Sequence, residues 1–207
     1  MVLDFHTHCL QAEHAIINAD ACRFFPQAGK CYSVGVHPWL AEQDAAAQWK
    51  RVQALAAHPQ VVAIGETGLD SLRGAPLAAQ MLLFEHHIAL AHQVGKPLVV
   101  HMVRTSQQVL QVWRRCQHHV PCAIHGFRGN AHVVQPLVEA GFYISFGEHF
   151  NTEALRQVPL CQILAETDES TLPIADIIAR MAEALSMPAA DVQTLISANL
   201  HRFLHRD

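Results

Sequence analysis

The sequence predicts an α/β fold of the TIM-like (β/α) barrel class, in a single domain over residues 1–207. Short apolar runs alternate with longer stretches of helical periodicity, which is the pattern of parallel βα units. Eight such runs occur, and eight is the number of strands in this barrel. A chain of 207 residues, 51% of them hydrophobic, can also close a sizeable core.

The eight apolar runs have the length and composition of buried strands. They cover residues 2–8, 15–19, 32–37, 61–66, 97–102, 122–127, 142–147 and 161–168. Strands of parallel βα units all point the same way. We therefore expect their C-terminal ends to meet on one face of the barrel.

Helical patterns separate the strands from about residue 41 onward. They cover residues 41–58, 75–95, 105–119 and 130–141, and three further patterns follow the last strand. Gly95, with Pro97 after it, marks a helix end. Thr105 or Ser106 and Asn130 are candidate N-caps of the two helices that follow.

The start of the chain departs from this regular pattern. Only about six residues separate the first two strands, whereas a parallel crossover with a helix needs about ten or more. We therefore expect the first helix to be missing. The second, within residues 20–30, is expected to be reduced to about a turn. The second strand would then run antiparallel or lie outside the barrel.

Charge and hydropathy exclude several classes of protein. The formal net charge is -4 and there is no run of Lys or Arg, so a broad basic face for duplex nucleic acid is absent. No basic leader precedes an apolar segment, and no apolar run approaches the roughly eighteen residues of a membrane span. We expect a soluble, cytoplasmic protein without membrane contact, and no obligate protein partner is evident.

The cysteines show no CxxC pair and no regular spacing, which is typical of reduced thiols in an intracellular enzyme. They are Cys9, Cys22, Cys31, Cys116, Cys122 and Cys161. We interpret them as mostly buried packing residues.

The stretch "FHTH" (5–8) places His6 and His8 two positions apart on the first strand. Side chains at i and i+2 of a strand project from the same face, so the two imidazoles aim at one point, as metal ligands do. The chain holds 16 histidines, and such a pair can also arise by accident.

Ligand-type side chains also stand at the ends of five other predicted strands. They are His37, Glu66, His101, His125 and Asp168. Each histidine could be a hydrogen-bonded core residue, and each carboxylate could be half of an ion pair. Because a barrel brings its strand ends together, the whole set predicts a metal site at the C-terminal face.

In chain order, the HxH pair, "GVHP" (35–38), "GETGLD" (65–70), the two strand-end histidines and "ETD" (166–168) resemble the TatD-type metal-dependent deoxyribonuclease family. The tail, residues 184–204, resembles the closing helices of that family. The family more usually has a Cys after His101 and after His125, and a small residue and Pro soon after Asp168. The groove that selects the substrate is therefore partly rebuilt in this chain.

The resemblance implies a hydrolase with two divalent metal ions. His6, His8 and Asp168 would bind one ion, His101 and His125 the second, and Glu66 would bridge the pair. A two-metal hydrolytic centre, with ions about 3.5 to 4 Å apart, needs such an anionic bridge. Related barrels use a carboxylated lysine, but Lys30, Lys50 and Lys96 do not stand at strand ends. Zn, Mn, Ni, Co and Mg are not distinguished by this ligand set.

The charges of this centre suit a phosphate, because two divalent ions outweigh the two carboxylates. A metal-bound water would be the nucleophile, and Asp168 would orient or deprotonate it. His37 would lie beside the substrate, or else be a structural residue before Pro38. Arg104 and Arg128, each three residues past a ligand histidine, would meet a phosphate oxygen or else be solvated surface charges.

These inferences predict a hydrolase acting on ester bonds, a DNase whose trimming of single-stranded DNA ends is implied by the resemblance. The alternative is a hydrolase of a small-molecule phosphate ester or cyclic amide with the same centre. A third is a noncatalytic metal-binding descendant. Glu169, next to Asp168, could repel a phosphate or tune the carboxylate.

Overall fold

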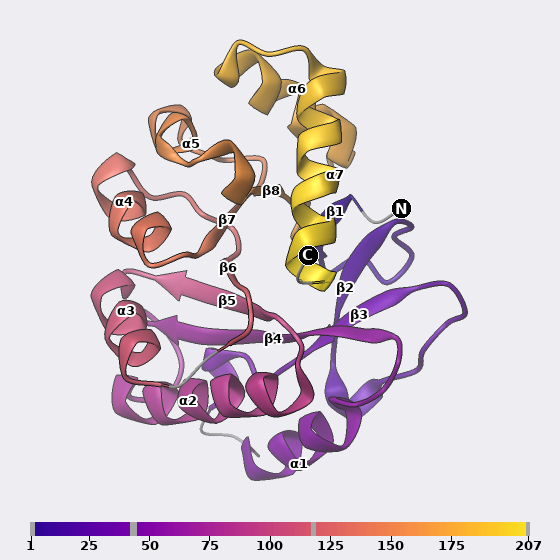
Figure 1. Cartoon of the computed structure of the whole chain (residues 1–207). Helices are drawn as coiled ribbons and strands as arrows, with labels where there is room; N and C mark the ends of the chain where they lie inside the picture. Colours follow the sequence, from indigo (N-terminus) through magenta and orange to yellow (C-terminus); the bar gives the residue numbers. More distant parts are fainter. Residues whose placement is uncertain (1–2, 42–44, 117–118, 206–207) are drawn as a thin grey trace. The chain divides into compact units, whose positions relative to one another are not determined.

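The computed structural model describes residues 3–41, 45–116 and 119–205 in two compact units. The first unit comprises Met1–Ile17 with Ala123–Asp207, and the second comprises Asn18–Cys122. The strand order in the sheet is the order of the chain, and the recorded strand pairs are parallel (Figure 1). This succession of parallel strands confirms the predicted TIM-like fold class. The single domain over residues 1–207 stays a prediction.

Each strand overlaps one of the predicted runs. The strands are β1 Asp4–Thr7, β2 Ala15–Ala19, β3 Cys31–Val34, β4 Val61–Asp70, β5 Leu98–Val103, β6 Cys122–Ile124, β7 Tyr143–Phe146 and β8 Ile163–Ala165. Strand β4 is longer than predicted because it continues through "GETGLD", so that both acidic residues of this motif lie on the strand.

Four of the helices correspond to the predicted ones. The α-helices are α1 Ala45–Leu55, α2 Leu77–Val94, α3 Ser106–Arg115, α4 Ala131–Glu139, α5 Thr152–Gln157, α6 Ile174–Leu185 and α7 Ala189–His205. Short 3-10 helices are η1 Ala21–Arg23, η2 Pro38–Leu40 and η3 Leu160–Gln162. Helix α5 was not predicted, and only α6 and α7 follow β8 within residues 166–205, where three helices were expected.

The predicted helix boundaries are mostly confirmed. Gly95 ends α2 in the left-handed conformation, with φ of 69°. Asn130 caps α4, since its side chain accepts a hydrogen bond from the Val133 amide. Thr105 stands at the N-cap position of α3, but its hydroxyl donates to the Leu69 carbonyl at 2.9 Å instead of capping the helix.

The connection from β1 to β2 confirms the missing first helix and corrects the expected strand direction. No helix occurs between the two strands, and η1 is the reduced second helix. Strand β2 nevertheless pairs in parallel with β1, with Asp4 opposite Ala15. Residues 8–14 can span about 23 Å when extended, while the four residues of β1 rise only about 13 Å. An extended loop therefore returns the chain without a helix.

Packing in the second unit fixes the C-terminal end of β4. Helix α2 lies against β4 and next to α3 (Figure 1). Gln80 of α2 is buried and accepts a hydrogen bond from the Asp70 amide at 2.7 Å. Its side-chain amide also donates to the carbonyls of Asp70, Arg73 and Ala75. One helix residue therefore holds the end of β4 and the turn that follows it.

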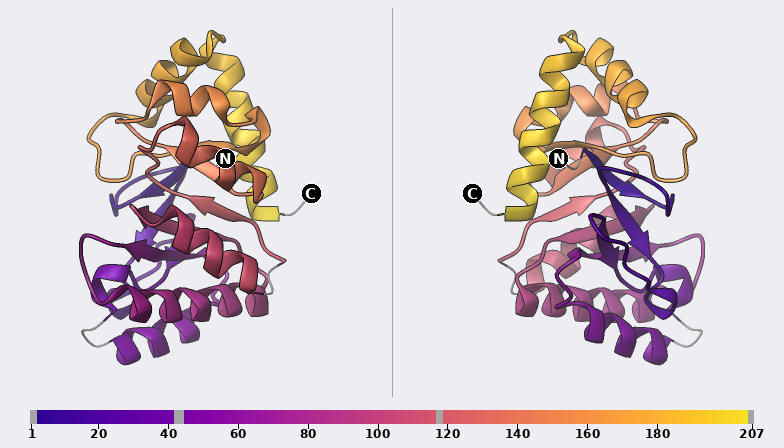
Figure 2. Two further views of the ribbon diagram at one scale, coloured as in Figure 1. Left: turned by 90° about the vertical axis from the view of Figure 1, so that its left-hand side faces the viewer. Right: turned by 90° about the vertical axis from the view of Figure 1, so that its right-hand side faces the viewer.

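The core of the first unit is formed by the apolar stripe of α7 and by buried strand residues. Val192, Ile196, Leu200 and Phe203 are buried and repeat at the spacing of one helix face. Phe203 meets Phe5 of β1 edge to face, with ring centroids 5.3 Å apart. Asn199 donates to the carbonyl of Ile163 in β8 at 2.7 Å. Figure 2 shows α7 beside α6 in two further views.

The environment of the cysteines corrects one expectation. All six thiols are free, but only Cys122 is buried, while Cys9, Cys22 and Cys161 are exposed. Burial raises the pKa of the Cys122 thiol well above its ordinary value. Among the described residues, no helix combines the length and the apolar character that a membrane span requires.

Candidate metal centre

In the first unit, the end of β1 brings two histidines next to Asp168. The Nε2 atoms of His6 and His8 lie 3.8 and 3.6 Å from Asp168 Oδ1. The His6 side chain is buried, whereas that of His8 is 41% exposed. The three side chains offer ligand atoms that all lie within 4.8 Å of one another.

Backbone hydrogen bonds fix Asp168 in this position. Its amide donates to the His6 carbonyl at 2.9 Å, and its carbonyl accepts from the His8 amide at 3.1 Å. Asp168 has a φ of 53°, in the left-handed region that aspartate tolerates better than most residues. Thr167 anchors the same segment, because its amide and hydroxyl both donate to the Asp4 carboxylate. Burial raises the pKa of Asp4 to about 6.

A second group in the first unit joins His125 and Asp168 through Glu166, a residue that the sequence analysis did not single out. Glu166 Oε1 accepts hydrogen bonds from the Gly126 amide at 2.6 Å and from His125 Nδ1 at 3.3 Å. Burial alone would raise the pKa of Glu166, but the neighbouring imidazoles of His125 and His6 hold it below its ordinary value. His125, Glu166 and Asp168 again offer ligand atoms within 4.8 Å of one another.

In the second unit, Glu66 of β4 is the centre of a hydrogen-bonded cluster. Its Oε1 lies 3.0 Å from His37 Nε2 and 2.9 Å from His101 Nδ1. Its Oε2 accepts from Asn18 Nδ2 at 3.0 Å. Gly65 makes this possible, because a Cβ at that position, with φ of 143°, would lie 2.4 Å from the Val99 carbonyl oxygen of β5.

Asp70, at the end of β4, engages the other side of His101. Its Oδ2 lies 3.3 Å from His101 Nε2 and accepts from the indole Nε1 of Trp39 at 2.7 Å. Burial alone would raise the pKa of Asp70, but the hydrogen bonds from Trp39, the Leu72 amide and His101 lower it below the ordinary value. The His101 imidazole is thus placed between two carboxylates.

His37 was predicted to be either a structural residue before Pro38 or a residue beside the substrate, and its contacts are compatible with both roles. Its Nδ1 accepts from the Trp39 amide at 3.1 Å and caps the short helix η2. A ring nitrogen that accepts leaves the proton on the other one, so Nε2 donates to Glu66. His37 is therefore both an N-cap and a neighbour of the predicted bridging carboxylate.

The two predicted arginines lie in different surroundings. Arg128 lines a hollow of about 210 Å³ in the first unit, together with Glu166 and Asp168. Glu148, His149 and Glu169 contribute to the same lining. Arg104 is exposed after β5 in the second unit. The structure therefore places Arg128 in one hollow with a predicted ligand, Asp168, and Arg104 is not part of that lining.

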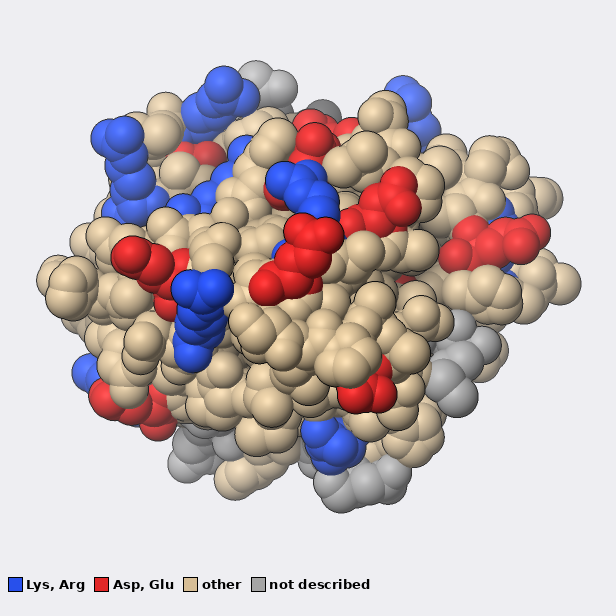
Figure 3. Space-filling view, turned by 90° about the horizontal axis from the view of Figure 1, so that it is seen from above, with Lys and Arg blue, Asp and Glu red and all other residues tan. Residues whose placement is uncertain are grey.

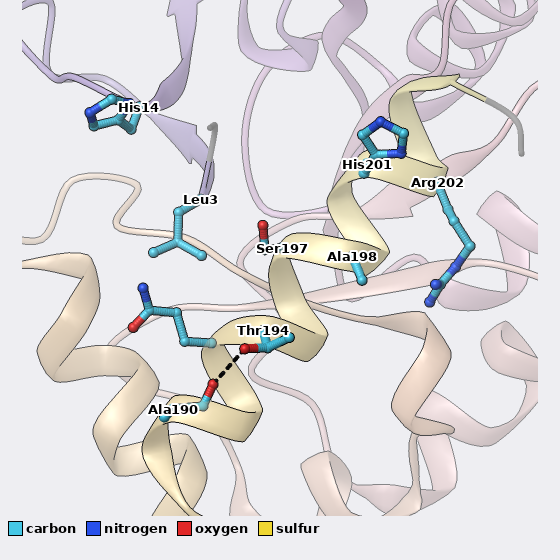
Figure 4. A pocket seen from close by; sticks show the side chains of 9 residues that line it. Leu3, His14, Ala190, Thr194, Ser197, Ala198, His201 and Arg202 are labelled. Carbon is cyan, nitrogen blue, oxygen red and sulfur yellow. Dashed lines mark hydrogen bonds between the residues drawn. The ribbon is translucent and has the colours of Figure 1, made fainter.

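A larger hollow in the first unit, of about 890 Å³, is lined by none of these side chains, and Figure 4 shows the residues that line it. Leu3 and His14 line one side, and the exposed face of α7 lines the other. Because it contains no carboxylate and none of the predicted ligands, it does not contribute to the candidate centre.

The residues present fit divalent metal ions. Two ligands held at about 2.1 Å from one ion in tetrahedral geometry are about 3.4 Å apart. The distances from His6 and His8 to Asp168 are close to this value and longer than a normal hydrogen bond. Glu166 Oε2 is buried with no hydrogen-bond partner among the described residues. A bound cation would stabilise a buried carboxylate oxygen that has no hydrogen-bond donor.

Sequence reasoning missed the residues that contact the predicted ligands. Glu166 was quoted within "ETD", and Asp70 within "GETGLD", but neither was assigned a role. The available signal was the carboxylate itself, placed at or near the end of a strand. Asn18 and Trp39 carry no such signal, because their roles depend on which strand end lies beside them.

Comparisons with known proteins identify the family of this chain. The model of a family described as TatD related DNase matches residues 7–205. A Mycobacterium tuberculosis protein named uncharacterized metal-dependent hydrolase TatD is 35% identical over 149 residues, which are 66% of this chain and 56% of that protein. The human 3'-5' RNA nuclease TATDN2 is 32% identical over 149 residues, 65% of this chain and 19% of the human protein.

A solved structure gives the corresponding comparison for the fold. The crystal structure of YjjV, a TatD homolog from Escherichia coli K12, superposes with a TM-score of 0.79 at 20% identity, over 92% of this chain and 85% of that chain. The matches to the Mycobacterium tuberculosis protein and to the Bacillus subtilis protein YabD span 56% and 57% of those relatives.

Proposed function

Because the chain belongs to the family of TatD related DNases, we propose that it is a metal-dependent hydrolase that cleaves phosphodiester bonds and trims single-stranded DNA ends. The observation that carries this proposal is the position of Asp168. Its carboxylate lies beside His6 and His8 and also lines the hollow that contains Arg128. A carboxylate that lies beside two imidazoles and lines the same hollow as a guanidinium suits metal-assisted phosphodiester hydrolysis.

The proposed ligands of two divalent ions are those that the resemblance implies: His6, His8 and Asp168 would bind one ion, His101 and His125 the other, and Glu66 would bridge the pair. His6, His8, His125 and Asp168 belong to the first unit, and Glu66 and His101 to the second. When bound, such ions polarise phosphoryl oxygens and lower the pKa of a coordinated water. Zn, Mn, Ni, Co and Mg are all candidates for these ions, because the ligand set does not distinguish them.

The proposed roles of the side chains follow from their chemistry. Asp168 orients the attacking water and accepts its proton at a carboxylate oxygen. Arg128 donates charge-assisted hydrogen bonds to a nonbridging phosphate oxygen. His37 donates through Nε2 to Glu66 and orients that carboxylate.

Single-stranded ends are the proposed substrate because the sequence contains no run of Lys or Arg that would bind a duplex. The net charge is -4. On the face in Figure 3, basic and acidic side chains are interspersed and neither sign covers a wide area. Because one relative is named an RNA nuclease, RNA oligonucleotides belong in the same substrate series. A cytoplasmic location remains part of the proposal.

A small-molecule phosphate ester or cyclic amide is the second candidate substrate. The hollow beside Asp168, about 210 Å³, is small, and Glu148 and Glu169 both line it. Acidic side chains at the entrance disfavour a polyanion more than a single phosphate group.

The test is cleavage of a 5′-labelled single-stranded DNA oligonucleotide by the full chain, loaded with each metal in turn. We expect a ladder that shortens from the 3′ end. Asp168→Asn should lower the rate by about 10³-fold, because it removes the proton acceptor. Asp176→Asn, which changes an exposed carboxylate that does not line the hollow, is the matched control and should retain most of the activity.

Absence of cleavage with every metal, in protein that binds the ions, would overturn the nuclease proposal. Hydrolysis of a small phosphate ester in the same preparation, also lost in Asp168→Asn, would then identify the second candidate as correct.

A further inference from the structure

Trp39 is an exposed aromatic residue whose orientation is nevertheless fixed. The residue is 44% exposed. Its indole N–H donates to Asp70 Oδ2 at 2.7 Å, and its backbone amide donates to His37 Nδ1. A large apolar ring that is held by both its side chain and its backbone loses little further freedom when a ligand binds to it.

The indole lies next to two residues of the proposed site. Its ring centroid is 4.6 Å from that of His37 and 5.9 Å from that of His101. The planes meet at 73° and 77°, so both imidazoles contact Trp39 edge to face. Neither imidazole therefore stacks flat on the indole.

Arg73 adds a positive charge to the same surface. Its guanidinium carbon lies over the Trp39 ring, 4.9 Å from the ring centroid, so the guanidinium covers one face of the indole and a base would stack on the opposite face. Gly74 permits this approach, because a Cβ at that position would lie 2.5 Å from the Pro38 carbonyl oxygen and 2.8 Å from the Trp39 Cα. The turn after β4 is thus packed directly against the turn that carries Trp39.

We propose that Trp39 is a stacking platform for one nucleobase of the substrate, with Arg73 beside it to meet the adjacent phosphate. An exposed indole and a guanidinium are the groups with which proteins bind single-stranded nucleic acid without reading its sequence. This inference rests on the proposed nuclease function and extends it: the enzyme takes an unpaired nucleotide, whose base is free to stack. A base within a duplex has no free face for the indole.

A purely structural role for Trp39, as the hydrogen-bond donor to Asp70, makes a different prediction. Trp39→Phe and Trp39→Leu both remove the indole N–H, but only Trp39→Phe keeps an aromatic face. Comparison of these two variants therefore separates stacking from the support of Asp70. Leu40→Ala, which alters the next exposed apolar side chain, is the control for a general apolar patch.

The first experiment measures binding rather than turnover. A fluorescein-labelled, phosphorothioate-linked single-stranded oligonucleotide of about eight nucleotides is titrated with the metal-loaded full chain, and anisotropy gives Kd. We expect Trp39→Leu to weaken binding at least about fivefold, the equivalent of one stacked base. Trp39→Phe and Leu40→Ala should stay within about twofold of the unsubstituted protein. Equal losses in Trp39→Phe and Trp39→Leu, or no loss in either, would overturn the stacking role.

A second experiment locates the stacked base. Oligonucleotides that carry one abasic site, moved along the sequence, should bind the unsubstituted protein normally except at one position. At that position the abasic site and Trp39→Leu should not add, since both remove the same contact. Additive losses at every position would contradict the proposal.

The two proposals fail in distinguishable ways. Cleavage of DNA by the unsubstituted protein, together with unchanged binding in Trp39→Leu, overturns the platform alone. If the unsubstituted protein neither cleaves nor binds the oligonucleotide, and deoxyadenosine monophosphate does not quench its tryptophan fluorescence, both proposals are overturned.

Discussion

The ligand groups of the two units differ in how their side chains are already engaged. In the second unit, His37, Glu66 and His101 are connected by contacts of 2.9 and 3.0 Å, and Asn18 and Asp70 extend this network. In the first unit, His6 and His8 stay 3.6 to 3.8 Å from Asp168. The side chains of the second-unit group are thus in direct contact, whereas those of the first-unit group lie farther apart; both groups offer ligand atoms within 4.8 Å of one another.

This difference indicates that the side chains of the two groups are held in place in different ways. A network that satisfies itself keeps its geometry without a ligand and places groups for a substrate. A group that contains a buried carboxylate oxygen with no recorded partner, such as Glu166 Oε2, depends more on a bound cation. We therefore expect the second unit to depend mainly on its internal hydrogen bonds and the first mainly on metal.

The largest expected effect concerns His87, which supports the network of the second unit. This buried imidazole accepts the Val36 amide, next to His37, at Nε2 and contacts the Leu83 carbonyl through Nδ1. Burial lowers the pKa of His87 to about 4. The folded protein keeps it neutral, whereas the unfolded chain binds a proton below about pH 6.5. The contribution of His87 to the free energy of unfolding should therefore fall by about 3 kcal/mol as the pH decreases from 6.5 to 4. Asp4, whose pKa is raised to about 6, acts in the opposite direction over that range, so the effect of His87 is the difference between the unsubstituted protein and the His87 variant.

Urea unfolding between pH 7 and pH 4.5 measures this loss. His87→Gln should be less stable than the unsubstituted protein at pH 7 and should show a weaker decline toward acid. His92→Gln, which changes an exposed histidine of the same helix, should keep the full pH dependence. An unchanged pH dependence in His87→Gln would show that the network does not rely on the neutral imidazole.

The sequence predicted which side chains stand at strand ends better than it predicted their surroundings. His6, His101 and Asp168 were proposed as ligands because barrel topology brings strand ends to one face, and this rule needs only strand positions. Their role as metal ligands stays a prediction. The contacts of Asp70 with Trp39 and Gln80 could not be found in this way, since they depend on side-chain directions in loops between the elements. The joint binding of one ion by His101 and His125, which belong to different units, stays a prediction.

The fold errors have similar physical causes. The antiparallel alternative for β2 was wrong because the crossover rule assumes a helix, and residues 8–14 return as an extended loop. Helix α5 was missed because its six residues are too short to show a helical period. The cysteines were expected in the core from their type, but exposure depends on the final position of each side chain.

Metal affinity should depend more on the acidic partner of His125 than on that of His101. Glu166→Gln and Asp70→Asn each remove one carboxylate charge beside a ligand histidine, at His125 and His101 respectively. Loss of such a partner typically costs 10- to 100-fold in metal affinity. Because Glu166 also offers a ligand atom of its own, we expect its loss to be near the upper limit, and that of Asp70 near the lower.

Competition titrations with a chromophoric chelator, followed by metal analysis of the dialysed proteins, measure both affinities. Equal losses in the two variants would remove the proposed distinction between the units. A larger loss in Asp70→Asn would reverse it and make the second unit the more metal-dependent one.

The smallest expected effect separates the two arginines. Arg128 lines the hollow that contains Asp168, whereas Arg104 is exposed and lies outside that lining. A charge-assisted hydrogen bond to phosphate from a partly solvated site contributes about tenfold in affinity. Arg128→Gln should therefore raise KM for the oligonucleotide about tenfold with little change in kcat, and Arg104→Gln should change KM by less than about twofold.

The variants Arg128→Gln and Arg104→Gln also show which of the two units binds the phosphate. A dominant effect of Arg128 places the phosphate beside the metal-dependent group of the first unit and leaves base stacking to Trp39 in the second. If Arg104→Gln has the larger effect, the phosphate is bound by the second unit instead. In that case the hydrogen-bonded group around Glu66 would position the scissile bond, and Asp168 would act mainly as a metal ligand.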